Sequence, residues 1–237
     1  KFIKLKLTFD IIISFLCVII LFSCQNHRES KSPIIIFILT DDQGYADLGV
    51  YGAEDFTTPN LDAMAADGAL FTSYYATQPV CSASRASILT GCYPNRIGIH
   101  GALSPNSKKG INPEETTLAE MLKKRGYATG GFGKWGCGGR GSTGVPENHG
   151  FDMFFGYYDQ VHAHSFYPPY LVKNSKEVLL EGNIGGRSGL SYSHYPIIEE
   201  GLNFIRKNKD KKFFAYFSIT PPHGMYDIPK DDPAWDL

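Results

Sequence analysis

The sequence lacks an excess of charge of either sign. Its 23 Lys and Arg residues nearly balance its 24 Asp and Glu residues, which gives a formal net charge of −1. Because a balanced chain creates no long-range field, net charge alone does not recruit nucleic acid or another polyanion. An anionic ligand must therefore be held by a few positive groups gathered at one place.

A hydrophobic run long enough to cross a membrane is also missing. The apolar run at residues 11–22 is shorter than the ~20 residues that a membrane-spanning helix needs. It follows three lysines within the first six residues and gives way to a polar stretch, a pattern typical of a secretory signal peptide. Nothing here predicts an integral membrane protein.

The end of this run predicts a lipid anchor. Residues 21–24 read Leu-Phe-Ser-Cys, which resembles the lipobox of bacterial lipoproteins. We therefore expect a signal peptide over residues 1–24 that ends at a lipidated Cys24, followed by a linker over residues 25–32. The resemblance implies an exported protein, held in the periplasm or at the outer membrane and cell surface through its lipid.

Cysteine is scarce, and the five that occur divide into groups. Cys17 lies in the expected signal peptide, and Cys24 is expected to carry lipid. Three remain, an odd number, so at least one thiol is unpaired or chemically special in an oxidising compartment. Cys81 is the candidate for that role, whereas pairing between Cys92 and Cys137 is left open.

Buried strands and amphipathic helices alternate along the rest of the chain. Strands are predicted at residues 34–39, 127–133 and 213–219, and the first is expected to be buried on both faces. Helices are predicted from Pro59, from the capping-box spacing of Thr117 and Glu120, and over residues 197–205. This order favours an α/β fold with a central, mostly parallel sheet flanked by helices.

Chemically active side chains follow the predicted strands. Asp41 and Asp42 come after the first strand, Lys134 after the second and His223 after the third. Because ligands of open α/β sheets bind beyond the carboxyl ends of the strands, we expect these residues to converge. Adjacent carboxylates are hard oxygen ligands that suit Ca²⁺ or Mg²⁺.

Residues 81–91 read CSASRASILTG, which resembles the signature of the type I, arylsulfatase-like sulfatases. Asp41-Asp42 upstream and Gly133-Lys134-Trp135 downstream follow the order of that family. The resemblance covers residues 33–237 and implies an alkaline-phosphatase-like fold. It also implies that the chain is the N-terminal portion of a bacterial lipoprotein sulfatase, truncated before the C-terminal part.

The resemblance implies hydrolysis of sulfate monoesters, with sulfated carbohydrate as the expected substrate. A formylglycine-generating, sulfatase-maturating enzyme would oxidise Cys81 to formylglycine, whose hydrate attacks sulfur. Arg85 would hold the hydrate, Lys134 would bind the sulfate, and His223 would contact sulfate or assist proton transfer. Asp41, Asp42 and Cys81 would bind the metal, for which the family favours calcium over magnesium. Small residues after Cys81 suit a helix start, whose free N–H groups attract an anion.

The sequence departs from the family at one position of the expected site. Many members have histidine two residues after the lysine, where this chain has Gly136. We hypothesise that His164 or His162 occupies the vacated space and contacts substrate. Further family ligands are expected beyond Leu237, so the 237-residue chain alone is predicted to be inactive.

Two other functions remain open from the sequence. A phosphodiesterase or phosphonate hydrolase of the same superfamily would share the architecture. A surface lipoprotein that binds sulfated glycans without cleaving them would leave Cys81 unmodified. His100 and His149 are interpreted as loop or packing residues rather than site residues.

Overall fold

A computed structural model describes residues 32–235. The expected signal peptide, Cys24, nearly all of the expected linker and Leu237 lie outside the described residues. Within residues 32–235, no helix is both long enough and apolar enough to span a membrane.

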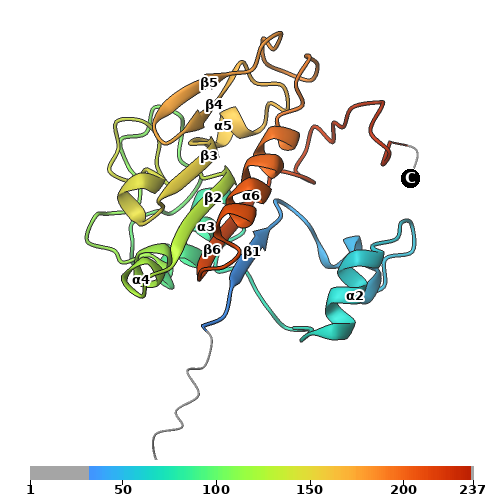
Figure 1. Cartoon of the computed structure of the whole chain (residues 1–237), viewed down its shortest axis with the longest axis horizontal. Helices are drawn as coiled ribbons and strands as arrows, with labels where there is room; N and C mark the ends of the chain where they lie inside the picture. Colours follow the sequence, from blue (N-terminus) through green and yellow to red (C-terminus); the bar gives the residue numbers. More distant parts are fainter. Residues whose placement is uncertain (1–31, 236–237) are drawn as a thin grey trace, which may run out of the picture. The chain divides into compact units, whose positions relative to one another are not determined.

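Six strands form one mixed sheet, whose spatial order is β1-β6-β2-β3-β4-β5 (Figure 1). The strands are β1 (Ile35–Leu39), β2 (Ala128–Lys134), β3 (Met153–Tyr157), β4 (Tyr170–Lys173), β5 (Lys176–Leu179) and β6 (Phe213–Ser218). Strands β1, β6, β2 and β3 run parallel, whereas β4 and β5 form an antiparallel hairpin at one edge. The predicted α/β fold with its mostly parallel centre is confirmed.

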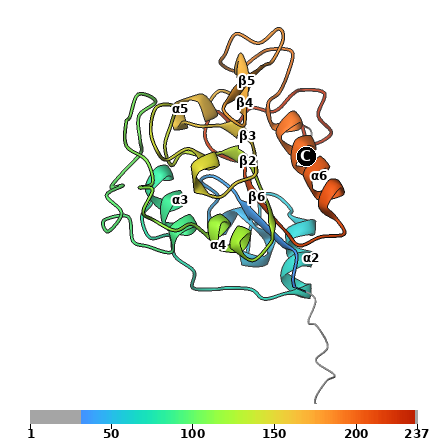
Figure 2. The same ribbon diagram turned by 60° about the vertical axis from the view of Figure 1, so that its left-hand side comes forward.

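Five α-helices and three short 3₁₀ helices accompany the sheet in the described part of the chain. They are α2 (Pro59–Asp67), α3 (Cys81–Thr90), α4 (Leu118–Lys124), α5 (Gln160–Ala163), α6 (His194–Asn208), η1 (Tyr45–Asp47), η2 (Gly49–Tyr51) and η3 (Pro146–His149). The predicted capping box opens α4, because Thr117 and Glu120 each bond the other's backbone N–H. Figure 2 shows α6 on one side of the sheet and α3 and α4 on the other.

The two faces of the sheet are buried by alternate residues of its strands. Along β6, Phe213, Ala215 and Phe217 pack with residues of α6, whereas Phe214 and Tyr216 pack in the cluster that contains residues of α3. All six residues of β6 are buried, as expected for a central parallel strand with helices on both faces. The sheet is therefore a rigid base for the loops at its carboxyl edge.

One expectation about burial is wrong. Ile36 and Ile38 of β1 are 48% and 53% exposed, and Ile35, Phe37 and Leu39 on the opposite face are only partly buried. The reason is its place at the edge of the sheet, where it pairs with β6 alone. Helix α2 likewise has no buried residue, so apolar sequence at these two elements did not predict burial within the described chain.

Candidate active site

The carboxyl ends of β1 and β2 bring Asp41 and Lys134 together. Lys134 is the last residue of β2 and is fully buried, with its Nζ donating to the Asp41 Oδ2 at 2.6 Å. Parallel register explains the meeting, because Leu39 and Gly133 both align with Ser218 on the strand between them. The predicted convergence at this sheet edge is observed.

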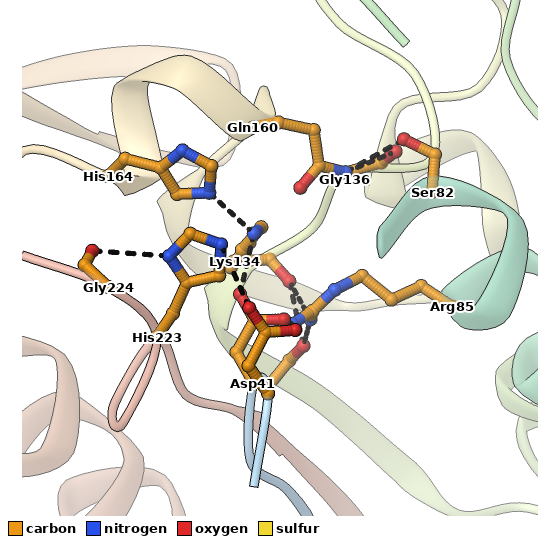
Figure 3. Close-up of polar contacts among 11 residues, drawn as sticks. Asp41, Ser82, Arg85, Lys134, Gly136, Gln160, His164, His223 and Gly224 are labelled. Atoms are coloured by element: carbon orange, nitrogen blue, oxygen red, sulfur yellow. Dashed lines mark hydrogen bonds and ion pairs between the residues drawn. The ribbon is translucent and has the colours of Figure 1, made fainter. Parts of the chain in front are cut away.

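Arg85 joins the same cluster from helix α3. It lies one helical turn after Cys81 and is 2% exposed, and its Nη2 is 3.1 Å from the Asp41 Oδ1. Its Nη1 donates to the Lys134 carbonyl oxygen at 2.8 Å and to the Ser218 hydroxyl. Arg85 therefore fixes α3 to the ends of β2 and β6 and holds the Asp41 carboxylate in place (Figure 3).

Helix α3 begins at Cys81, as the small residues after it predicted. Val80 at the N-cap has extended backbone, so the chain turns sharply into the helix at Cys81. The first N–H groups of a helix lack intrahelical acceptors and lie at the positive end of its dipole. Cys81 is partly exposed, and the helix start can hold an anion beside it.

Two histidines stack over this cluster. The rings of His164 and His223 are 4.0 Å apart and nearly parallel. His164 Nε2 is 3.0 Å from the Lys134 Nζ, and His223 Nε2 is 3.3 Å from the Asp42 Oδ2. Asp42 itself is mostly exposed and has a φ of 62°, in the left-handed region that Asp tolerates better than most residues.

His162 lies elsewhere, although it is only two residues from His164. Its Nε2 is 2.8 Å from the Tyr170 carbonyl oxygen, and its ring packs against Tyr157 and Tyr170. Asp159 accepts a hydrogen bond from the His162 backbone N–H and so caps α5. The structure directs His164 to the cluster and His162 into packing.

Charge and burial set the protonation of the cluster. Burial raises the pKa of Asp41, but the charges and hydrogen bonds of Arg85 and Lys134 outweigh burial and lower it below its usual value. Burial, with the nearby charges of Lys134 and His223, lowers the pKa of His164 to about 4. At neutral pH His164 is therefore uncharged, and its Nε2 accepts a hydrogen bond from the Lys134 ammonium.

The donor atoms of this cluster can surround a metal ion. One ligand atom each from Asp41, Cys81, His164 and His223 lies within 4.8 Å of the others. Carboxylate oxygen suits a hard divalent cation, and imidazole and thiolate suit softer ones. Asp42 is outside this group and contacts it through His223. The residues present therefore fit a divalent metal, with Asp41 as the buried carboxylate ligand.

Several residues of the cluster had not been predicted. Ser218 accepts from Arg85 and donates to the Lys134 carbonyl oxygen at 2.7 Å. Gln160 contacts Ser82 and Gly136. Ser218 is the last residue of β6, one residue before the predicted end of that strand, so the strand-end rule could have found it. Gln160 follows β3, whose sequence gave no recognised strand signal.

The other two described cysteines, Cys92 and Cys137, are free thiols in the structure. Cys137 is fully buried, and burial raises the pKa of its thiol to about 12. A buried protonated thiol is inert, so the partly exposed Cys81 at a helix start is the better placed nucleophile. His149 is buried and His100 is exposed, and neither contacts the cluster, in agreement with their interpretation as packing and loop residues.

Together, the fold and the cluster define an α/β protein with a buried group of charged side chains, and with donor atoms that fit a divalent metal, at the carboxyl edge of its sheet. The sequence profile of the sulfatase family matches residues 33–235. The chain belongs to the sulfatase family, and the predicted resemblance is confirmed.

Individual relatives agree with this assignment. N-acetylgalactosamine-6-sulfatase of Rattus norvegicus is 38% identical over 219 residues, which cover 82% of this chain and 40% of that protein. The crystal structure of Ps i-CgsB in complex with k-i-k-neocarrahexaose has a TM-score of 0.72 at 31% identity, covering 81% of this chain and 46% of that one.

The structure of BT4656 in complex with its substrate D-glucosamine-2-N,6-O-disulfate has a TM-score of 0.66 at 27% identity, covering 82% of this chain and 35% of that one. The chain thus spans less than half the length of these relatives.

Proposed function

We propose that the protein containing this chain hydrolyses sulfate monoesters, with residue 81 as the nucleophile after its conversion to formylglycine. The observation that carries the proposal is the position of Cys81. It is the first residue of α3, and its Sγ lies within 4.8 Å of ligand atoms of Asp41, His164 and His223. A nucleophile at a helix N-terminus, facing fixed charges, suits attack on an anionic ester.

The chain's own residues would share the binding of the sulfate group. The α3 N–H groups and the Lys134 ammonium supply positive charge where negative charge develops on sulfate oxygens. Arg85 bonds Asp41, Ser218 and the Lys134 carbonyl oxygen, so we assign it to holding the site together. Such preorganised donors need no rearrangement during the reaction.

The two stacked histidines would serve hydrogen bonding and proton transfer. His164 is neutral near pH 7 and accepts from Lys134, so it keeps the ammonium directed into the cluster and can contact substrate. His223 faces Asp42 and is assigned to proton transfer to the leaving alcohol oxygen. When residue 81 carries the aldehyde, its hydrate supplies the attacking oxygen and a second hydroxyl that releases sulfate without another nucleophile.

We further propose that calcium is the resident metal. Asp41 would bind it together with residue 81, whose oxygen after oxidation is a harder ligand than a thiolate. Asp42, which lies outside the four-residue group beside His223, would add its exposed carboxylate as a further ligand. Bound metal would polarise the sulfate oxygens as a Lewis acid. Magnesium, which demands stricter octahedral geometry, suits a site with one exposed and one buried carboxylate less well.

A sulfated carbohydrate is the proposed substrate. Among the similar structures, Ps i-CgsB holds a neocarrahexaose and BT4656 holds a disulfated glucosamine as its substrate. Export fits such a substrate, so we propose that residues 1–24 direct secretion and that Cys24 anchors the protein through lipid. A sulfatase-maturating enzyme that oxidises Cys81 is then a required partner.

Mass spectrometry of the peptide that contains residue 81, isolated from active full-length protein, tests this proposal. Conversion of the thiol to an aldehyde is expected to lower the peptide mass by about 18 Da, and Cys81→Ala to reduce turnover of a sulfated sugar by at least about 10⁴-fold. The matched control is Cys92→Ala, which alters a thiol outside the cluster. An unmodified thiol in active protein, or faster turnover of phosphate diesters than of sulfate esters, would contradict the proposal.

A further inference from the structure

One buried amide contacts the segments that carry the site. Gln160, the first residue of α5, is 4% exposed, and its Nε2 donates to the Ser82 Oγ at 2.8 Å and to the Gly136 carbonyl oxygen at 3.0 Å. Ser82 directly follows Cys81, and Gly136 follows Lys134 by two residues. Gln160 itself lies four residues before His164. A single side chain thus connects the segments bearing the nucleophile, the lysine and the histidine (Figure 3).

The orientation of this amide is fixed by its partners. The Gly136 carbonyl can only accept a hydrogen bond, so the NH₂ group of Gln160 must face it, and the amide oxygen must face away. That oxygen is buried and has no hydrogen-bond partner within residues 32–235. Buried polar atoms are rarely left unpaired. An apolar side chain of the same length would fill this space without burying an unpaired oxygen. The two hydrogen bonds of the amide nitrogen, rather than the filling of space, therefore explain a glutamine at this position.

The backbone opposite the amide is shaped to admit it. Gly136 has a φ of 71°, and a Cβ on it would lie 2.0 Å from the Gln160 Nε2 and 2.9 Å from its Cδ. Any side chain at residue 136 would therefore displace the amide. The glycine and the glutamine form a matched pair, and the space that a side chain at residue 136 would enter is filled by Gln160 rather than, as hypothesised, by His164 or His162.

We propose that Gln160 is a positioning residue of the sulfate-ester site. By holding the Ser82 hydroxyl, it sets the first turn of α3, and so residue 81, relative to Lys134 and His164. The Ser82 Oγ also accepts from the Leu103 N–H at 3.0 Å, which anchors the same turn from the other side. This inference rests on the proposed function, because the property that Gln160 controls is the placement of the nucleophile.

Gln160→Met in the full-length protein tests the inference, because methionine keeps the length and removes the hydrogen bonds. Misplacement of a reacting group by about 1 Å costs on the order of 10²-fold, so kcat is expected to fall about 10- to 100-fold while KM changes little. Peptide mass at residue 81 is measured for each variant, so that incomplete conversion is not mistaken for slow turnover.

Asn183→Leu is the matched control. Asn183 is a buried amide whose Nδ2 also makes two hydrogen bonds to carbonyl oxygens, those of Pro168 and Ser191, in a loop outside the cluster. Both variants are expected to lower the Tm, whereas only Gln160→Met is expected to lower kcat. Equal kcat values in the two variants would overturn the inference.

Ser82→Ala removes the same hydrogen bond from its other end. It is expected to lower kcat in the same range, and the double variant with Gln160→Met should lose less than the product of the two single losses. An unchanged kcat in Ser82→Ala would overturn the inference even if Gln160→Met does not fold. Wild-type protein that hydrolyses no sulfate ester would instead refute the proposed function, and the inference with it.

Discussion

The two ends of strand β2 hold polar clusters of opposite character. At the carboxyl end, the side chains of Asp41, Arg85 and Lys134 are all at least 93% buried. The Asp41 carboxylate forms ion pairs with both cations. At the amino end, Asp152 accepts from the Thr129 N–H at 3.0 Å and from its hydroxyl, and pairs with Lys123 at 2.6 Å while both charged side chains remain nearly half exposed.

The difference separates a functional arrangement from a structural one. Burying three charges costs desolvation that their mutual attraction only partly offsets, so such a cluster is a poor way to stabilise a fold. The amino-end cluster needs little desolvation and ties α4 and the β3 entry to the sheet through water-accessible groups. Along the same strand, the amino-end cluster therefore contributes little free energy through exposed groups, whereas the buried carboxyl-end cluster holds the groups to which the proposed function assigns the chemistry.

The largest effect is expected from Lys134→Met. It leaves the Asp41 carboxylate buried with Arg85 as its remaining charged partner, and breaking a buried pair in this way costs about 3–5 kcal/mol of unfolding free energy. Loss of a donor to developing negative charge should also lower kcat by about 10²- to 10³-fold. Urea unfolding of the full-length protein measures the loss of unfolding free energy, and its turnover of a sulfated sugar measures the loss of kcat.

Lys123→Met is the matched control, because it makes the same substitution at the opposite end of β2. Its side chain is 49% exposed, so the expected loss of stability is about 0–1 kcal/mol and kcat should be unchanged. If the two variants lose similar stability and activity, the contrast between the ends of the strand is wrong.

A smaller effect is expected from His164→Ala. Removing the hydrogen-bond acceptor of the Lys134 ammonium should lower kcat by about 10- to 100-fold. This loss is smaller than the loss expected on removing a general acid or base, because His164 is not assigned to proton transfer. His162→Ala changes a histidine two residues away that bonds the Tyr170 carbonyl oxygen, so it should lower the Tm with kcat retained. Full activity in both variants would remove the hypothesis that either histidine serves the site.

The sequence predicted the parts of this arrangement that depend on local pattern. Apolar runs located β1 and β6, and the helix end at Gly126 located the start of β2. The rule that ligands bind at strand ends then pointed to Asp41, Lys134 and His223. The capping box of α4 and the start of α3 at Cys81 were also correct. Each of these is decided by residues close in sequence.

What the sequence did not predict depends on contacts between distant segments. Gln160 meets Ser82 across 78 positions, and no periodicity marks such a contact. The choice between His162 and His164 depends on how α5 lies against β3 and β4. The exposure of Ile36 and Ile38 depends on which strand stands at the edge of the sheet, which composition alone cannot tell.

The smallest effect concerns pH and belongs to the structural side of the comparison. His149 is fully buried near the amino end of β2, where its carbonyl accepts from Thr117 and its Nε2 is 3.2 Å from the Ile111 carbonyl oxygen. Burial lowers the pKa of this imidazole, and the charge of Glu120 and the hydrogen bond to Ile111 only partly oppose the shift. The folded protein therefore resists protonating His149.

The sign of the pH dependence follows from that shift. Below about pH 6.5 the unfolded chain takes up a proton at His149 that the folded chain does not, so unfolding free energy should fall as pH falls, by at most about 1.4 kcal/mol per pH unit for this group. His149→Gln removes the titration and should flatten the curve of unfolding free energy between pH 7.5 and 5.5, although the substitution itself lowers stability. An equally steep curve in the variant would show that the acid sensitivity arises elsewhere, and the carboxyl-end cluster of Asp41 and His164 would then be the next place to measure it.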